Sequence, residues 1–395
     1  MSRFAKKTVR DVDVAERRVL VRVDFNVPLA ADGSIADDTR IRETLPTITY
    51  LQEQGARTIL CSHLGRPKGR DPKLSLRPVC DRLADLLGRP VGFAEDCIGP
   101  PAFAATDVMQ PGDVVLLENV RFHPGEEAND PEFAKALASL CELYVNDAFG
   151  AAHRAHASTE GVAHYRRAVA GLLMEKELRY LGELVEDPPR PFAAVIGGAK
   201  VSSKLGALRR LLEKVDVMVV GGGMANTFLA ARGLRLGRSL VEEPLLPAAR
   251  EVLDEAERRG VTLLLPVDLV VARSLEDSSP WVVDAEHVPA DAMAVDIGPR
   301  SVEAIREALE PAAAVVWNGP MGIFEREPFA RGSLAVAEVI AGLRATTVVG
   351  GGETVALVSQ AGLRDRYSHV STGGGASLEL LEGKELPGVA VLEDR

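Results

Sequence analysis

A chain of 395 residues is longer than one hydrophobic core usually supports, so we expect two domains. A hydrophobic content of 46% excludes a disordered chain, and no apolar run reaches the roughly 18 residues that cross a bilayer. The net charge of −11 argues against a nucleic-acid partner held by overall attraction. An anionic ligand would therefore need a local cluster of cations.

The first half alternates short apolar runs with segments of helical pattern. The runs are Arg18–Val23, Thr58–Cys61, Val114–Leu117 and Leu143–Val145, and the helical segments include Arg42–Gln54, Arg77–Leu87 and Pro131–Cys141. This alternation predicts a parallel sheet covered by helices on both faces. In such sheets ligands bind beyond the carboxyl ends of the strands, and here each run is followed by polar residues.

The predicted strand ends of the first half carry a set of cations. Arginine binds phosphate or carboxylate oxygens through two parallel hydrogen bonds, so several arginines together indicate a small ligand with more than one negative charge. Asp24 and Asn26 would bind hydroxyl groups of the same ligand. For any single arginine a solvated surface position is the simpler interpretation, but the repeated placement favours a binding site. The cations are Arg40, His63, Arg66, Arg121, Arg154 and His156.

Metal and thiol chemistry receive little support from the sequence. Three histidines suggest zinc, but no carboxylate or cysteine is spaced to complete a site. The cysteines also lack metal-ligand spacing, and the first residues lack the apolar stretch of a secretory signal, so we expect reduced thiols in a cytoplasmic protein. The histidines are His153, His156 and His164, and the cysteines are Cys61, Cys80, Cys97 and Cys141.

Between the halves lies the pattern of one amphipathic helix. Its apolar stripe consists of Met174, Leu178, Leu181 and Val185, and prolines after Asp187 end it. The remaining faces would carry Glu175, Lys176, Glu177, Arg179 and Glu183. The simple interpretation is an ordinary connecting helix over 171–186. The alternative is a lever that holds two half-sites which must meet.

In the second half the apolar runs end in glycine. The runs are Ala193–Ile196, Val217–Val220, Ala313–Trp317, Thr346–Val349 and the residue Val370. Glycine after a strand lets the backbone approach a ligand closely, and a helix that begins there directs free amides at an anion. Lys200 and Lys204 are four residues apart and are expected on one helical face beside phosphates. The pattern predicts a phosphate site.

Several common nucleotide motifs are missing. The chain has no Gly-x-x-x-x-Gly-Lys-Ser/Thr loop, and no Gly-x-Gly-x-x-Gly follows the first strand of either half. A nicotinamide dehydrogenase is therefore disfavoured. The catalytic His-Arg-Asp loop of protein kinases is also missing.

Eight segments, collinear over nearly the whole chain, resemble phosphoglycerate kinases. They are Val23–Pro28, Ser62–Pro67, Glu118–His123, Asn146–Ser158, Met174–Leu178, Gly197–Ser202, Trp317–Glu325 and Ser371–Ser377. The resemblance implies two Rossmann-like three-layer α/β/α domains with parallel sheets, joined by a hinge helix. It also implies a glycolytic reaction, the reversible and direct in-line transfer of a phosphoryl group between 1,3-bisphosphoglycerate and ADP on domain closure.

The resemblance assigns roles to individual residues. The first domain, 1–170, would bind phosphoglycerate through Asp24, Phe25, Asn26, Arg40, His63, Leu64, Gly65, Arg66, Arg121 and Arg154. The second, 187–375, would bind magnesium ADP or ATP through Lys204, Asn318, Glu325, Gly351, Gly352, Glu353 and Thr354, with Glu325 on the ribose. The phosphoryl group in transfer would face Arg40, Lys200 and amides near Gly374 and Gly375. Residues from about 376 to 395 would pack back on the first domain, and family precedent implies a monomer without nucleic-acid or membrane partners.

The chain departs from the family pattern at two positions. Glu353 stands where the magnesium-linked carboxylate is commonly aspartate, and Ala151 replaces a hydroxyl-bearing residue. We expect Glu353 to hold Mg²⁺ loosely or through water, since octahedral Mg²⁺ tolerates displaced ligands poorly. The alternative is that Glu353 only favours the dipole of the helix beginning near Thr354.

The implied chemistry needs no general base, because the carboxylate acceptor is already ionised at neutral pH. Catalysis then depends on alignment and on neutralising the charge of the transferring group. Two other classes remain as alternatives, a hinged binding protein with an anion pocket and a dehydrogenase. A coupled assay with 3-phosphoglycerate and ATP separates the three.

Overall fold

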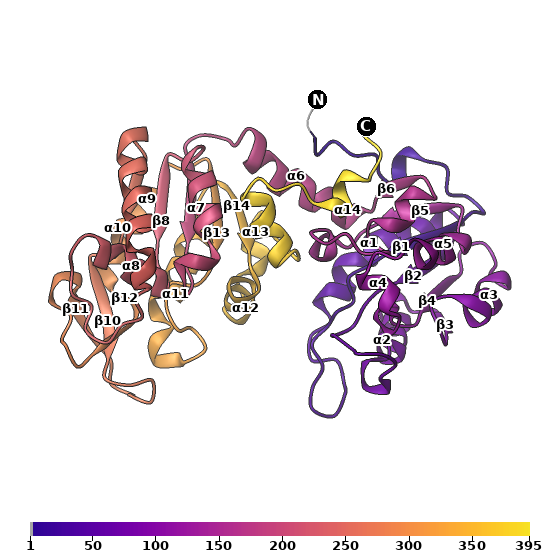
Figure 1. The fold of residues 1–395 in the computed structure, drawn as a ribbon, viewed down its shortest axis with the longest axis horizontal. Coiled ribbons are helices and arrows are strands. Elements are labelled where there is room, and N and C mark those ends of the chain that lie inside the picture. Colours follow the sequence, from indigo (N-terminus) through magenta and orange to yellow (C-terminus); the bar gives the residue numbers. More distant parts are fainter. Residues whose placement is uncertain (1–2) are drawn as a thin grey trace. The chain divides into compact units, whose positions relative to one another are not determined.

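The computed structural model describes residues 3–395, which divide into two compact units (Figure 1). One unit contains residues 3–179 and 385–395, and the other contains residues 180–384. The first division falls within helix α6 (Leu172–Glu186). Among the described residues, no helix combines the length and apolar character needed to cross a membrane.

The first unit is built on a six-stranded parallel sheet in the order β3-β4-β2-β1-β5-β6. Its strands are β1 (Arg18–Arg22), β2 (Arg57–Cys61), β3 (Gly92–Ala94), β4 (Val114–Leu117), β5 (Leu143–Asn146) and β6 (Ala168–Ala170). Its helices include α1 (Thr39–Glu53), α2 (Arg77–Leu87), α3 (Gly99–Asp107), α4 (Pro124–Glu127), α5 (Pro131–Ser139) and α14 (Pro387–Ala390). The four predicted strands are confirmed. The sequence analysis did not predict β3 and β6, three-residue strands at the two edges of the sheet.

Strand β1 is central and buried on both faces. Val19 and Val21 belong to the large hydrophobic cluster between the sheet and helices α1 and α2. Because side chains alternate along a strand, Leu20 and Arg22 lie on the opposite face. Arg22, at the carboxyl end of β1, is only 1% exposed.

Helix α6 begins against the end of β5. The Asp147 carboxylate accepts hydrogen bonds from the amides of Leu173 and Met174 at 2.9 and 3.0 Å. A Cβ on Gly171 would lie 2.1 Å from the same oxygen, so this close approach requires glycine. The apolar stripe predicted for α6 is buried, and Glu177, outside this stripe, is also fully buried.

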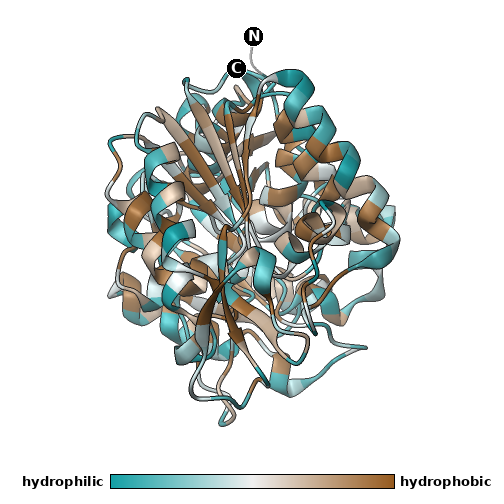
Figure 2. Ribbon diagram, turned by 90° about the vertical axis from the view of Figure 1, so that its left-hand side faces the viewer, coloured by the Kyte–Doolittle hydropathy of each residue, from teal (hydrophilic) through white to brown (hydrophobic). Residues whose placement is uncertain are grey.

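The second unit contains a six-stranded parallel sheet in the order β15-β14-β13-β7-β8-β9. Its strands are β7 (Phe192–Ile196), β8 (Val217–Val220), β9 (Thr262–Leu264), β13 (Ala314–Asn318), β14 (Thr346–Gly350) and β15 (His369–Val370). Its helices include α7 (Leu205–Leu212), α8 (Gly222–Ala231), α9 (Leu246–Arg259), α10 (Pro299–Leu309), α11 (Arg331–Ala341), α12 (Gly352–Gln360) and α13 (Gly375–Leu381). Figure 2 shows hydrophobic strands between helices whose outer faces are hydrophilic.

A small antiparallel sheet in the same unit was not predicted from the sequence. It consists of β10 (Asp268–Ala272), β11 (Trp281–Asp284) and β12 (Met293–Ile297), in the order β11-β10-β12. Along β11 half-buried and exposed positions alternate, so no position of this strand is fully buried, although Trp281–Val283 is apolar. The end of β12 places Asp296 near the glycine loops described below.

Candidate substrate and nucleotide sites

The predicted anion-binding residues follow neighbouring strands of the first unit. Strands β4, β2, β1 and β5 are adjacent in the sheet, so the loops after them share one edge. Asp24 follows β1 and His63 follows β2. Arg121 lies in the short helix after β4 (Val120–Phe122), and Arg154 lies beyond β5.

Asp24 and Arg40 form an ion pair between Oδ2 and Nη1, which brings α1 to the end of β1. Asp24 is 8% exposed. Burial raises the pKa of this carboxyl, but the charges of Arg40, His63 and Arg22 outweigh burial and keep the pKa below its ordinary value. Asp24 therefore stays ionised and orients Arg40.

The loop after β2 is held from both sides at Gly65. Its amide donates to Asn26 Oδ1 at 2.8 Å, and its carbonyl accepts from Arg121 Nη1 at 2.8 Å. Gly65 has φ +63°, and a Cβ would lie 2.9 Å from the Leu74 side chain. The Arg121 side chain is almost buried and also pairs with Glu127 at 3.2 Å.

The other predicted residues of this site differ in exposure. Phe25 and Leu64 are buried, and the Phe25 amide donates to Ser62 Oγ at 2.9 Å. Arg66 is exposed, and within residues 3–395 its side chain has no hydrogen bond or ion pair. Arg154 Nε donates to His153 Nε2 at 3.2 Å. The unpaired fork of Arg66, the other arginines near it in the fold and the buried Asp24 together suit a compact anion that also carries hydroxyl groups.

The three histidines considered for zinc contact other groups. His164 pairs with Glu160, and His156 Nδ1 lies 4.0 Å from Glu126. A different group, Asp96, Cys97 and His123, brings three metal-ligand atoms within 4.8 Å of one another. However, Asp96 Oδ1 already accepts hydrogen bonds from His123 Nε2 and the Cys97 amide, each at 2.7 Å. The Asp96 carboxylate oxygen therefore has two hydrogen-bond donors already and does not need a metal ion as a partner.

In the second unit, Lys204 is largely buried among backbone oxygens. Its ammonium donates to Gly197 O, Asn318 O and Asn318 Oδ1 at 2.7, 3.0 and 2.7 Å. Burial lowers the pKa of Lys204 to about 8, and Glu353 partly opposes this shift. Lys204 therefore ties the loop after β7 to the loop after β13.

The expectation that Lys200 and Lys204 share a helical face is wrong. A single 3₁₀ turn, Val201–Ser203, separates them, and α7 begins only at Leu205. Lys200 is exposed, whereas the Lys204 side chain points inward. Its hydrogen bonds to the carbonyls of Gly197 and Asn318 hold it there, and the sequence spacing does not reveal them.

The glycine loops enclose a cavity of about 300 Å³ in the second unit. Gly222 has φ +67°, and a Cβ would lie 2.7 Å from the Gly198 amide and carbonyl, so only glycine lets these loops meet. The cavity combines an apolar wall with three carboxyl groups, those of Asp296, Glu325 and Glu353, which suits a flat base joined to a polar sugar. Its lining includes Gly198, Gly223, Leu269, Met293, Met321, Glu325 and Glu353.

Residues 351–354 begin helix α12 beside this cavity. Gly351 has φ +88°, and Thr354 Oγ1 accepts a hydrogen bond from the Gly319 amide at 2.6 Å. Glu353, in the first turn, is exposed, and in the described chain its carboxylate accepts no hydrogen bond. Asn318 is 3% exposed, and among residues 3–395 its Nδ2 has no acceptor. Such a buried orphan donor indicates room for a ligand oxygen.

The remaining glycine loop precedes α13. Gly374 has φ +52°, and Gly375 is the first residue of the helix. The loop is closed by Ser371, whose hydroxyl lies 2.7 Å from Ser377 Oγ and accepts from the Gly373 amide at 3.0 Å.

Comparison with known proteins identifies the family. The family model described as phosphoglycerate kinase matches residues 9–384. The chain belongs to the phosphoglycerate kinase family. Phosphoglycerate kinase of Pelotomaculum thermopropionicum is 58% identical over 394 residues, which cover 99% of this chain and all of the relative. That of Moorella thermoacetica is 57% identical with the same coverage.

Solved structures agree with this assignment. The phosphoglycerate kinase from Coxiella burnetii has a TM-score of 0.90 at 42% identity, and that from Pyrococcus horikoshii has 0.86 at 34%. Each comparison covers 98% of both chains. The phosphoglycerate kinase fold, with two parallel-sheet α/β units, thus extends over nearly the whole chain.

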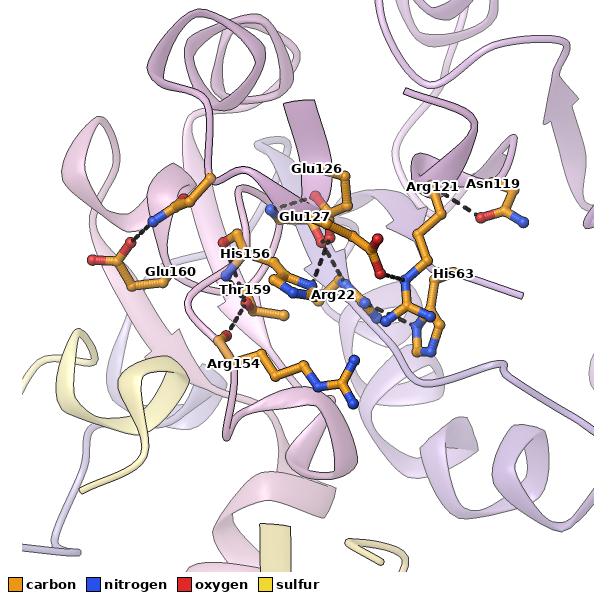
Figure 3. Close-up of polar contacts among 12 residues, drawn as sticks. Arg22, His63, Asn119, Arg121, Glu126, Glu127, Arg154, His156, Thr159 and Glu160 are labelled. Carbon is orange, nitrogen blue, oxygen red and sulfur yellow. Dashed lines mark hydrogen bonds and ion pairs between the residues drawn. The ribbon is translucent and has the colours of Figure 1, made fainter. Parts of the chain in front are cut away.

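A buried charged group near the candidate anion site could not be recognised in the sequence. Arg22 and Glu126 (Figure 3) are both almost fully buried, and each forms a hydrogen bond with the hydroxyl of Ser158. Burial raises the pKa of Glu126, and the charge of Arg22 and the hydrogen bonds from Ser158 partly offset this effect. The one available signal was an arginine inside a buried apolar run, which requires a partner.

Proposed function

We infer that the chain catalyses the reversible transfer of a phosphoryl group between 1,3-bisphosphoglycerate and ADP, giving 3-phosphoglycerate and ATP. The observation that carries this conclusion is the match to phosphoglycerate kinases over residues 9–384. The cation-lined strand ends of one unit and the glycine-lined cavity of the other support it, since the reaction needs one site for each substrate.

We propose that the phosphoglycerate binds to the first unit. The arginine forks of Arg40, Arg66, Arg121 and Arg154 would bind its phosphate and carboxylate, and Asp24 and Asn26 would bind its hydroxyl group. Asp24 is suited to this role because the neighbouring cations keep it ionised. The Arg40 guanidinium would also face the transferring phosphoryl group.

The nucleotide is assigned to the second unit. The apolar cavity would take the base, Glu325 would bind the ribose, and the loop around Gly351–Thr354 would hold the phosphates. Asn318 Nδ2, a buried donor without an acceptor in the described chain, would donate to the nucleotide. Lys204 would hold the loops after β7 and β13 together rather than act as a free cation, because its three N–H donors already have acceptors.

Magnesium would be held by Glu353 and the nucleotide phosphates. The residues present fit such an ion, because Glu353 is exposed and its carboxylate accepts no hydrogen bond from the described chain. When bound, Mg²⁺ neutralises phosphate charge. Lys200 would stabilise the transferring group from the other side, together with amides near Gly374 and Gly375.

Transfer itself is proposed to be direct and in line. The acceptor carboxylate is ionised at neutral pH, so neither His63 nor His156 is needed as a base. Since the two candidate sites belong to different units, the units must come together when both substrates are bound. We further propose that the protein acts as a cytoplasmic monomer.

A coupled assay tests this function directly. Purified protein is supplied with 3-phosphoglycerate, ATP and Mg²⁺, and the acyl phosphate formed is reduced by a dehydrogenase that consumes NADH. We expect NADH consumption that requires all three components. A protein that binds 3-phosphoglycerate but forms no acyl phosphate would instead be a binding protein.

A further inference from the structure

Arg22, at the carboxyl end of β1, is buried and binds three groups, of which Figure 3 labels His63. Its Nε donates to Ser158 Oγ at 2.7 Å, and Nη1 donates to the Val23 carbonyl. Its Nη2 lies 3.0 Å from Nδ1 of His63. Arg22 therefore connects the end of β1 to the loop after β2 and to the segment after β5.

The contact with Arg22 determines where His63 carries its proton. A guanidinium has only N–H donors and stays charged in proteins, so Nδ1 of His63 must accept this hydrogen bond. A protonated Nδ1 would place two N–H groups against each other. In a neutral imidazole with an unprotonated Nδ1, the proton is on Nε2. Within the described chain, Nε2 has no hydrogen-bond partner.

The surroundings also favour a neutral ring. His63 is 6% exposed, and burial lowers its pKa well below the ordinary value. Asp24 opposes this shift, whereas Arg22, Arg121 and Arg40 reinforce it. The three arginines come from β1, from the short helix after β4 and from helix α1, and Asp24 comes from the loop after β1.

A buried counter-charge keeps Arg22 in place. Ser158 donates from its hydroxyl to Glu126 Oε1 at 2.6 Å and from its amide to Oε2 at 2.9 Å. Glu126 is fully buried. The chain Glu126–Ser158–Arg22–His63 thus satisfies a buried carboxylate and a buried guanidinium, as such a pair requires.

We propose that Arg22 is a positioning residue that fixes His63 as the neutral tautomer protonated on Nε2. His63 then acts as a hydrogen-bond donor to an anionic oxygen of the phosphoglycerate and not as a cation. The role in substrate binding rests on the proposed function, but the tautomer does not. The contribution of His63 to binding is therefore independent of pH around neutrality, unlike that of an ordinary histidine.

Nitrogen NMR of the intact protein tests the tautomer without any substitution. In protein labelled with ¹⁵N-histidine, two-bond proton–nitrogen correlations distinguish a protonated ring nitrogen from an unprotonated one, and His63→Gln assigns the signal. We expect a protonated Nε2 and an unprotonated Nδ1 at every pH between 5.5 and 8. A proton on Nδ1, or a transition within this range, would overturn the proposal.

Variants of the network then test the role of Arg22. Arg22→Met combined with Glu126→Gln removes both buried charges, so it avoids leaving one charge unpaired. We expect His63 to lose its fixed tautomer or to titrate in this variant. The matched control is Ser158→Ala, which disturbs the same network but keeps the Arg22–His63 contact and should keep the tautomer. An unchanged tautomer in the folded double variant would refute the role of Arg22.

Kinetics test the donor role separately. The phosphate of 3-phosphoglycerate titrates near pH 6, so the KM of wild type and His63→Gln must be compared at each pH. We expect their KM ratio to stay constant from pH 5.5 to 8, and His63→Ala to raise KM by about tenfold or more. A ratio that increases as the pH falls would show a cationic His63. A complete lack of phosphoryl transfer by the wild type would refute the proposed function, whereas the NMR result would still decide the tautomer.

Discussion

Among single residues, Lys200 and Lys204 show how two lysines four positions apart acquire different tasks. The Lys204 ammonium donates to carbonyls of two loops and so holds these loops together at the candidate nucleotide site. Lys200 is exposed, and in the described chain its ammonium makes no hydrogen bond or ion pair within 4 Å. Only Lys200 is therefore available to a transferring phosphoryl group.

Substitution of Lys200 is expected to affect the transition state. Lys200→Ala should lower kcat on the order of 10²–10³-fold with little change in KM for either substrate, the pattern that follows when only transition-state contacts are lost. Lys135→Ala, at an exposed position of α5, is the matched control and should leave both constants unchanged. If only the KM for ATP increases, Lys200 binds the nucleotide in the ground state instead.

Glu353 is the residue at which the chain leaves the family pattern. Glu353 is in the first turn of α12, and its additional methylene displaces the carboxylate oxygens by about 1.5 Å relative to aspartate. We expect a bound water between Glu353 and Mg²⁺ to compensate for this displacement. Glu353→Asp should be nearly as active as the parent, whereas Glu353→Ala should raise the Mg²⁺ concentration for half-maximal rate several-fold. Magnesium titrations of both variants measure this effect. An alanine variant with unaltered metal dependence would leave Glu353 only a favourable charge at the helix start.

Among the elements, helix α6 depends on a buried carboxyl at its start. Asp147 accepts hydrogen bonds from the amides of Leu173 and Met174, yet burial raises its pKa to about 6. A group whose pKa is higher in the folded state stabilises the fold at low pH, and this contribution is lost as the pH rises through the folded pKa. Asp147 should therefore make the free energy of unfolding depend on pH between about pH 4 and pH 6.

Asp147→Asn should remove this pH dependence. Relative to the variant, the wild type should lose about 3 kcal/mol of unfolding free energy between pH 4 and pH 7, because two pKa units correspond to that amount. Chemical denaturation of both proteins across this range measures the difference. Parallel stability curves would mean that Asp147 keeps the same protonation state in the folded and unfolded chain.

The elements also show why only part of the structure could be predicted from the sequence. The central strands were predicted because runs such as Val114–Leu117 are buried on both faces and continuously apolar. Strand β11 was not predicted although Trp281–Val283 is apolar, because no glycine loop follows it as it follows the predicted strands of the second half. Lys204 and Arg22 were misassigned or missed because their partners, Asn318 and Ser158, are 114 and 136 positions away. Local spacing carries no information about such contacts.

At the scale of the whole molecule, we propose that each substrate binds to its own unit. The arginine set belongs to residues 3–179, and the glycine-lined cavity belongs to residues 180–384. Helix α6 contains the division between the two units and has a continuous buried stripe. We propose that it acts as the lever between them. We propose that the units close around both substrates, because an acyl phosphate must be protected from water.

Small-angle X-ray scattering tests this central claim most directly. The radius of gyration is measured for the free protein, with 3-phosphoglycerate, with the magnesium complex of a non-hydrolysable ATP analogue, and with both ligands together. The account predicts that both ligands together reduce the radius more than either ligand alone. One unchanged radius in all four states, measured under conditions that saturate both sites, would contradict it.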